Sequence, residues 1–140
     1  MASVKGINIT NLDAVPVALP KASEVHGRIR VWFDSYEASS LASGSDIKIA
    51  RLPENATVFE VVIHHDALGT SVTLSVGDAS SATRYIGATA AASAGKIIMS
   101  EDGAIDGFGF ENVSETDVLI TTGGAVATGT IKIAIMYAVD

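Results

Sequence analysis

The sequence predicts an all-β fold: a single β-sandwich, jelly-roll-like, preceded by an extended N-terminal arm. From residue 27 onward, apolar residues recur at every second position, which is the period of a β-strand. Clusters of Gly, Asp, Asn and Ser separate these runs at intervals of roughly ten residues, as in antiparallel sandwiches and jelly rolls. Sustained helical periodicity is nearly absent. At 140 residues, the chain has the size of one domain.

Five runs carry the clearest strand pattern. "GRIRVWFDS" alternates Ile29, Val31 and Phe33 with Arg28, Arg30, Trp32 and Asp34. "SDIKIAR", "SVTLSV" and "GTIKIAIMYAV" also alternate, and the last run places Ile131, Ile133 and Ile135 on one face. "ATVFEVVIHH" is apolar on both faces, with Phe59, Val61 and Ile63 opposite Val58 and Val62, which predicts a central strand. Shorter strands are expected at 82–86, 96–99, 107–110 and 117–121.

Two segments depart from this pattern and define the predicted organisation. Residues 1–26 contain Pro16 and Pro20 and no sustained period, so they are expected to form the arm, with the sandwich spanning 27–140. The run "GATAAASAG" at 87–95 is expected to be a loop of small residues packed closely against another backbone.

Composition excludes several classes of function. Nine Lys and Arg against sixteen Asp and Glu give a formal net charge of −7, which disfavours nucleic acids and anionic membranes as partners. The absence of cysteine removes thiolate catalysis and cysteine-based zinc sites. The apolar runs are far shorter than the ~20 residues that span a bilayer.

The strongest candidate for chemistry is "VVIHHDALGTSVTLSVGD" at 61–78. It contains His64, His65 and Asp66, but adjacent strand residues point to opposite faces, so both imidazoles cannot bind one metal while the strand persists. Asp66 and Gly69 instead predict the turn of a hairpin whose connection runs from about 65 to 70, and Gly77–Asp78 predicts a second turn. A metal-dependent sandwich enzyme using His26, His64 and His65 is the lesser alternative.

No other motif indicates catalysis or ligand binding. "EDGAIDGFGFEN" offers Asp102, Asp106 and Glu111, but Ala104 and Val113 stand where a calcium loop needs acidic ligands. The G-X-S-X-G nucleophile motif is absent. We therefore predict that the protein is not an enzyme, with no catalytic residue, metal site or cofactor.

The run "IKIARLPENATVFEVVIHHDALGTSVTLSVGDASSATRYIGATAAASAGK" resembles small proteins encoded near the head genes of tailed bacteriophages. The resemblance rests on the Leu-Pro entry, "HDALG", "TLSVGD" and "RYI", and extends over about 45–140. It implies a capsid decoration or cement protein: a sandwich, typically a homotrimer, that binds the major capsid protein on the outer surface of the virion and is assembled in the host cytoplasm.

A cement protein needs a rigid core and an arm or strand edge that clasps its neighbours. Residues 1–26 are therefore expected to contact the capsid or a neighbouring subunit. The rival hypothesis is a tail-fibre or receptor-binding sandwich of a phage virion. Low aromatic content, 6% with Trp32 as the single tryptophan, disfavours a carbohydrate platform of stacked rings.

Overall fold

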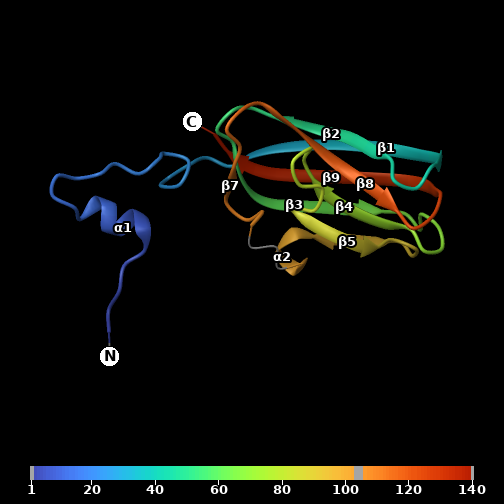
Figure 1. Cartoon of the computed structure of the whole chain (residues 1–140), viewed down its shortest axis with the longest axis horizontal. Helices are drawn as coiled ribbons and strands as arrows, with labels where there is room; N and C mark the ends of the chain where they lie inside the picture. Colours follow the sequence, from blue (N-terminus) through green and yellow to red (C-terminus); the bar gives the residue numbers. More distant parts are fainter. Residues whose placement is uncertain (1, 103–105, 140) are drawn as a thin grey trace.

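The computed structural model describes residues 2–102 and 106–139, which form a two-layered β-sandwich with an arm projecting from one end (Figure 1). Two short helices are present in these residues, α1 (Ile7–Leu12) in the arm and α2 (Met99–Asp102) after the sixth strand. The described strands are β1 (Arg30–Leu41), β2 (Asp46–Leu52), β3 (Thr57–His65), β4 (Thr73–Gly77), β5 (Ile86–Ala90), β6 (Gly95–Ile98), β7 (Phe110–Glu111), β8 (Thr116–Gly123) and β9 (Ala127–Ala138). The predicted all-β sandwich is confirmed.

The strands pair in a nested order. The first sheet runs β1-β9-β3-β6, with β7 pairing the start of β3, and the second sheet runs β2-β8-β4-β5. The first half of the chain thus folds back on the second half, and most successive strands alternate between the sheets. This is the strand arrangement of a jelly roll.

The predicted hairpin between β3 and β4 is wrong, because these strands lie in different sheets. Residues 66–72 cross from one layer to the other. Leu68 fills the end of the sandwich: its N–H donates to the Ala91 carbonyl at 3.0 Å, and its carbonyl accepts from the Thr128 N–H at 3.0 Å. The turn residues do redirect the chain here, but toward the opposite sheet.

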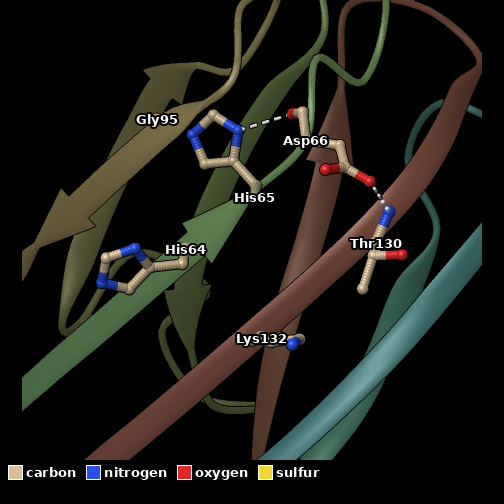
Figure 2. Close-up of a pocket in the computed structure, with 6 residues that line it drawn as sticks. All are labelled: His64, His65, Asp66, Gly95, Thr130 and Lys132. Carbon is tan, nitrogen blue, oxygen red and sulfur yellow. Dashed lines mark hydrogen bonds between the residues drawn. The ribbon is translucent and has the colours of Figure 1, made fainter.

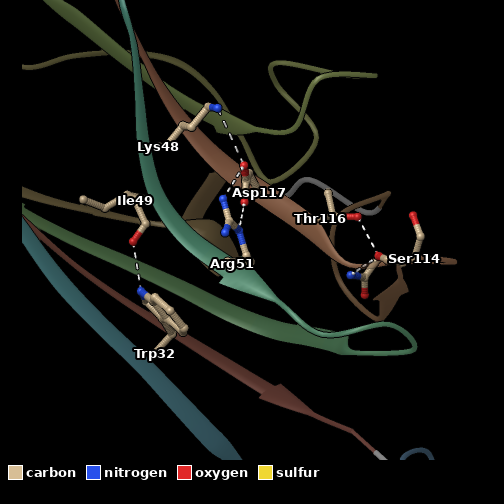
Figure 3. Close-up of polar contacts among 8 residues, drawn as sticks. Trp32, Lys48, Ile49, Arg51, Ser114, Thr116 and Asp117 are labelled. Carbon is tan, nitrogen blue, oxygen red and sulfur yellow. Dashed lines mark hydrogen bonds and ion pairs between the residues drawn. The ribbon is translucent and has the colours of Figure 1, made fainter.

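The core lies between the two layers and follows the predicted alternation. Ile131, Ile133 and Ile135 of β9 are fully buried, as the last run predicted. The two sheets are also tied by a polar contact, because the indole Nε1–H of Trp32 on β1 donates to the Ile49 carbonyl of β2 at 2.9 Å (Figure 3).

Strand β1 carries its apolar side outward. Trp32 pairs with the buried Ile135 of β9 and shares its inward face, so Val31 and Phe33 point to solvent, with exposed fractions of 59% and 65%. Ile29, just before the strand, is also exposed. The two-residue period correctly predicted a strand here. The side of the strand that faces the core carries Trp32, whereas Val31 and Phe33 lie on the outer side.

A bulge changes the faces of β3. The register against β9 shifts between Val58 and Glu60, so Val58 is buried with Val61 and Ile63, while Phe59 is only partly buried. The prediction that Phe59 shares the face of Val61 and Ile63 is wrong, because one extra residue in the bulge reverses the alternation before it.

The small-residue run is partly a strand. Residues 86–90 form β5, which pairs with β4 at the edge of the second sheet, whereas 82–85 lie outside any strand. The loop expected at 87–95 is thus confined to 91–94. The ladder to β4 supplies hydrogen bonds that outweigh the weak strand propensity of alanine.

The arm has an anchored part and a projecting part. Near the sandwich, Lys21 pairs with Glu111 and Ser23 is buried. Gly27 closes this turn at a position where a Cβ atom would lie 2.7 Å from the Ser23 carbonyl oxygen. Residues 2–20 extend away from the sandwich, and α1 interrupts the extended conformation expected for them (Figure 1). No described helix is long and apolar enough to cross a bilayer.

Candidate functional site

Three of the residues singled out from the sequence, His64, His65 and Asp66, lie around a hollow of about 340 Å³ at the end of the first sheet (Figure 2). Strands β3 and β9 position them, with His64 opposite Lys132 and His65 opposite Ile131. The hollow is lined by His64, His65, Asp66, Gly95, Thr130 and Lys132.

The two histidines point to opposite faces, as the alternation predicted: His64 is exposed and His65 is buried. The His65 Nδ1–H donates to the Asp66 carbonyl oxygen at 2.8 Å, as the dashed line in Figure 2 marks. A carbonyl can only accept, so Nδ1 carries the hydrogen in this contact. This bond fixes the His65 ring away from His64.

The Asp66 carboxylate closes the ladder between β3 and β9. Its Oδ2 accepts from the Thr130 N–H at 3.0 Å, and the Asp66 N–H donates to the Thr130 carbonyl at 3.0 Å. The carboxylate thus bonds a distant strand rather than its own turn, and Gly69 has the positive φ, 135°, that a turn glycine supplies. Gly129 has a φ of 140°, which favours glycine, and a Cβ there would lie 3.1 Å from the Asp66 Cβ.

The third histidine lies at the other end of the sandwich. His26 precedes β1, whose Arg30 is level with Val58 of β3 through their common partner Tyr137. Seven residues of strand, about 23 Å, separate that level from His65. Across residues 2–102 and 106–139, no group of three His, Asp or Glu side chains is placed to hold a metal.

We expect protein purified without a histidine tag to contain no stoichiometric zinc, iron or manganese. The reason is geometric, because a bound transition metal needs convergent ligands and the imidazoles diverge. Metal analysis of the purified protein and of His64→Ala checks this. One equivalent of metal in the wild type that disappears in His64→Ala would contradict it.

A buried ion pair that sequence reasoning missed joins β4 to β5. The Asp78 Oδ1 accepts from the N–H groups of Ser80 and Ser81 at 3.0 and 2.9 Å, and Oδ2 accepts from Arg84 Nε at 2.7 Å. Burial alone would raise the pKa of Asp78. The bond to Arg84, the two backbone donors and the Arg84 charge outweigh burial and hold this pKa below its usual value.

Aromatic rings enclose the same pair. The Arg84 guanidinium lies 3.9 Å from the centre of the Phe110 ring, and Tyr85 packs edge-on against Phe110. Burial, then the charge of Asp78, raises the pKa of Tyr85 to about 12, so the phenol stays neutral. The sequence predicted the Gly77–Asp78 turn. Arg84, six residues after Asp78, could have indicated the partner of the Asp78 carboxylate. These contacts lock the β4–β5 connection.

The remaining candidates do not assemble into a site. Asp106 is exposed, Glu111 pairs with Lys21, and Ala104 lies outside the described residues. Trp32 is half-buried, with its indole N–H bound to Ile49, so little of its ring is open for stacking on a sugar.

Comparison with known proteins gives a consistent result for the fold. A chain of the cyanophage Pam1 capsid asymmetric unit superposes with a TM-score of 0.68 at 25% identity, covering 91% of this chain and 97% of that chain. Two further phage capsid structures contain similar chains. The Ralstonia phage GP4 capsid contributes one at 0.67 and 18% identity, covering 88% and 90% of the two chains. The Helicobacter pylori bacteriophage KHP30 capsid contributes another at 0.60 and 14%, covering 82% and 90%.

Sequence comparison adds nothing to these structural likenesses. No protein-family model matches the chain, and no curated protein sequence matches it.

Proposed function

We propose that the chain is a non-enzymatic structural protein of a phage virion: a decoration or cement protein that binds the major capsid protein on the outer surface of the shell and stabilises it. The observation that carries the proposal is the likeness to the cyanophage Pam1 capsid chain over nearly the full length of both chains. The divergent histidines and the structural use of Asp66 and Asp78 fit a protein whose role is to bind rather than to catalyse.

The arm is the part best suited to clasp a neighbour. Its projecting residues 2–20 carry apolar side chains that the chain itself leaves exposed, and Val15 is 98% exposed. Covering such side chains is favourable by roughly 25 cal/mol per Å² of apolar surface, so a bound partner is the expected environment of this segment. The exposed apolar residues of the arm are Val4, Ile7, Ile9, Leu12, Val15, Val17 and Leu19.

Deleting residues 2–20 is expected to weaken binding to shells of the major capsid protein at least about tenfold, because the apolar contacts of the arm are lost. The sandwich should still fold, since the anchored segment with Lys21 and Ser23 remains. Co-sedimentation with empty shells measures binding, and circular dichroism with thermal unfolding checks the fold. Unchanged binding by the truncated, folded protein would remove the arm from the interface.

A matched control separates loss of apolar contacts from loss of chain length. Ile7→Ser with Leu19→Ser should reproduce most of the defect, whereas Asn8→Ser with Asn11→Ser in the same segment should not. Wild-type protein that fails to sediment with shells would refute the proposed function itself.

We further propose that the protein acts as a homotrimer. Analytical ultracentrifugation should then give a particle of three 14.4 kDa chains. If truncation of residues 2–20 dissociates this particle, the arm clasps a neighbouring subunit; if the trimer persists while shell binding falls, the arm clasps the capsid.

A further inference from the structure

The outer faces of the two sheets have opposite characters. On the first sheet, one row of neighbouring residues crosses β1, β9, β3 and β6 and is apolar throughout: Phe33, Ala134, Val62 and Ile98. We call this the apolar row. Phe33 is 65% exposed, and the other three are half-buried by their neighbours within the sheet. An unbroken apolar row on a solvent-facing sheet is typical of a surface that a partner covers.

A second row beside it carries positive charge. Lys132, His64 and Lys96 are direct neighbours on β9, β3 and β6, and all three are exposed. Figure 2 shows His64 and Lys132 on adjoining strands. Within the described residues, neither lysine has an ion pair. We call this the basic row.

Carboxylates also border this face, and in the described part of the chain none forms an ion pair with Lys96 or Lys132. Glu101, which is exposed, lines a hollow of about 160 Å³ together with Lys96. Glu60 accepts from the N–H groups of Val61 and Ser100, both at 3.1 Å, and Asp66 accepts from Thr130. Glu37 stands on the edge strand β1, beyond the basic row. The lysine ammonium groups therefore remain available to carboxylates from outside the chain.

The second sheet presents a polar and internally neutralised face. Asp117 accepts from Arg51 at 2.6 Å and lies 3.9 Å from Lys48 (Figure 3). The Arg51 hydrogen bond, followed by the Arg51 charge, holds the pKa of Asp117 below its ordinary value. The Thr121 hydroxyl donates to Asp46 at 2.9 Å. The charged side chains described on this face are therefore paired with one another or hydrogen-bonded, which is compatible with exposure to water.

The apolar row is also continuous with the arm. Ile29 and Val31 are exposed and lead along the chain from the anchored end of the arm to Phe33. A partner that covers the projecting arm can therefore extend onto the first sheet without crossing a polar boundary. This continuity favours one large partner surface over two separate ones.

We propose that the outer face of the first sheet is the surface by which the protein docks on the capsid shell, with the outer face of the second sheet directed to solvent. The partner is the shell of the major capsid protein, and its docking surface presents apolar side chains to the apolar row and carboxylates to Lys132 and Lys96. This inference rests on the proposed function and adds an orientation on the shell to it.

Amine labelling of the wild-type protein tests the orientation without any mutation. The free protein and its complex with empty shells are treated briefly with an acetylating reagent, and mass spectrometry follows each lysine. Lys96 and Lys132 should label at least about fivefold more slowly in the complex, because a desolvated interface excludes reagent and water. Lys48, on the opposite face, is the internal control and should label equally in both samples.

Charge variants provide a second measurement. Lys96→Gln with Lys132→Gln and the control Lys48→Glu each change the formal net charge of −7 by two units, so both proteins carry −9. The double variant should bind shells about tenfold more weakly and the control within about twofold of the wild type, because only the former removes cations from the interface. Phe33→Ser should also weaken binding, and Val113→Ser, exposed in a loop, should not.

The outcomes separate the two proposals. If wild-type protein binds shells but Lys96 and Lys132 label as fast as in the free protein, the docking face is wrong and the cement function stands. If wild-type protein does not bind shells, both are wrong. If Lys96 and Lys132 become protected without shells as protein concentration rises, a second copy covers this face and the inference is overturned.

Discussion

Replacing Asp78 with asparagine is expected to lower the free energy of unfolding by about 3 kcal/mol, because it leaves the Arg84 guanidinium without its buried carboxylate. The side chains of Asp78 and Arg84 are only 6% and 18% exposed, so water cannot replace the missing partner. For a chain of this length, the midpoint of thermal unfolding should fall by roughly 10 °C. Calorimetry or urea unfolding measures both quantities.

The effect should depend on pH in a defined direction. The pKa of Asp78 is lower in the folded protein than in the unfolded chain, so acid favours the unfolded chain, which takes up the proton more readily. The stabilisation is complete above the unfolded-state pKa of about 3.9 and is lost as pH falls through the folded-state value. The stability difference between wild type and Asp78→Asn should therefore be constant near neutral pH and narrow below about pH 4.

Asp117→Asn is the matched control. It removes the same type of carboxylate–guanidinium contact, 2.6 Å against 2.7 Å, but from the surface of the second sheet. Exposed ion pairs contribute little, so this variant should unfold close to the wild type. Equal losses in the two variants would show that burial of the Asp78 pair has no special energetic role.

Replacing Ile133 with alanine is expected to cost about 3–4 kcal/mol, the range for truncating a fully buried isoleucine. Ile133 lies on β9 between the strands β1 and β3 and is 1% exposed, so the paired strands on either side limit collapse of the cavity. Urea unfolding monitored by tryptophan fluorescence measures the loss, since Trp32 packs against the same core.

Phe33→Ala provides the contrast on the neighbouring strand. It removes a larger side chain, yet the stability of the isolated protein should stay within about 0.5 kcal/mol because Phe33 is mostly exposed. A loss from Phe33→Ala as large as that from Ile133→Ala would mean that the outward face of β1 is covered in the isolated protein.

These two residues show how far the sequence predicts the fold. Alternation located the long strands, because each side chain on a pleated strand is committed to one of two faces. It could not decide which face of β1 points inward, since Trp32 and Phe33 are both apolar. Pairing with β9 decides this, and that partner lies about a hundred residues away in the sequence.

The crossover after β3 shows the same limit. Asp66 and Gly69 mark a change of chain direction, which local residue preferences encode well. Whether the chain then returns along the same sheet or passes to the other depends on the partners of β4, which are β8 and β5. Local turn chemistry carries no information about those partners.

At the candidate site, strand geometry separated His64 from His65 correctly, because it required only the two-residue period. The partner of Asp66 could not be predicted, since Thr130 comes from a distant strand. The Asp78–Arg84 ion pair could have been predicted, because both residues lie in one short connection between strands. A carboxylate buried in a turn is stable only when a cation or hydrogen-bond donors are close to it.

The central position of β9 has a consequence for biosynthesis. Strands β1 and β3 contact each other only through β9, so the first sheet cannot close until residues 127–138 have left the ribosome. Until then, the nascent chain exposes both open strand edges and the apolar side chains that β9 later covers, which is a state prone to aggregation. Folding of the first sheet therefore waits for β9, and the arm has no completed sandwich beside it until those residues have been synthesised.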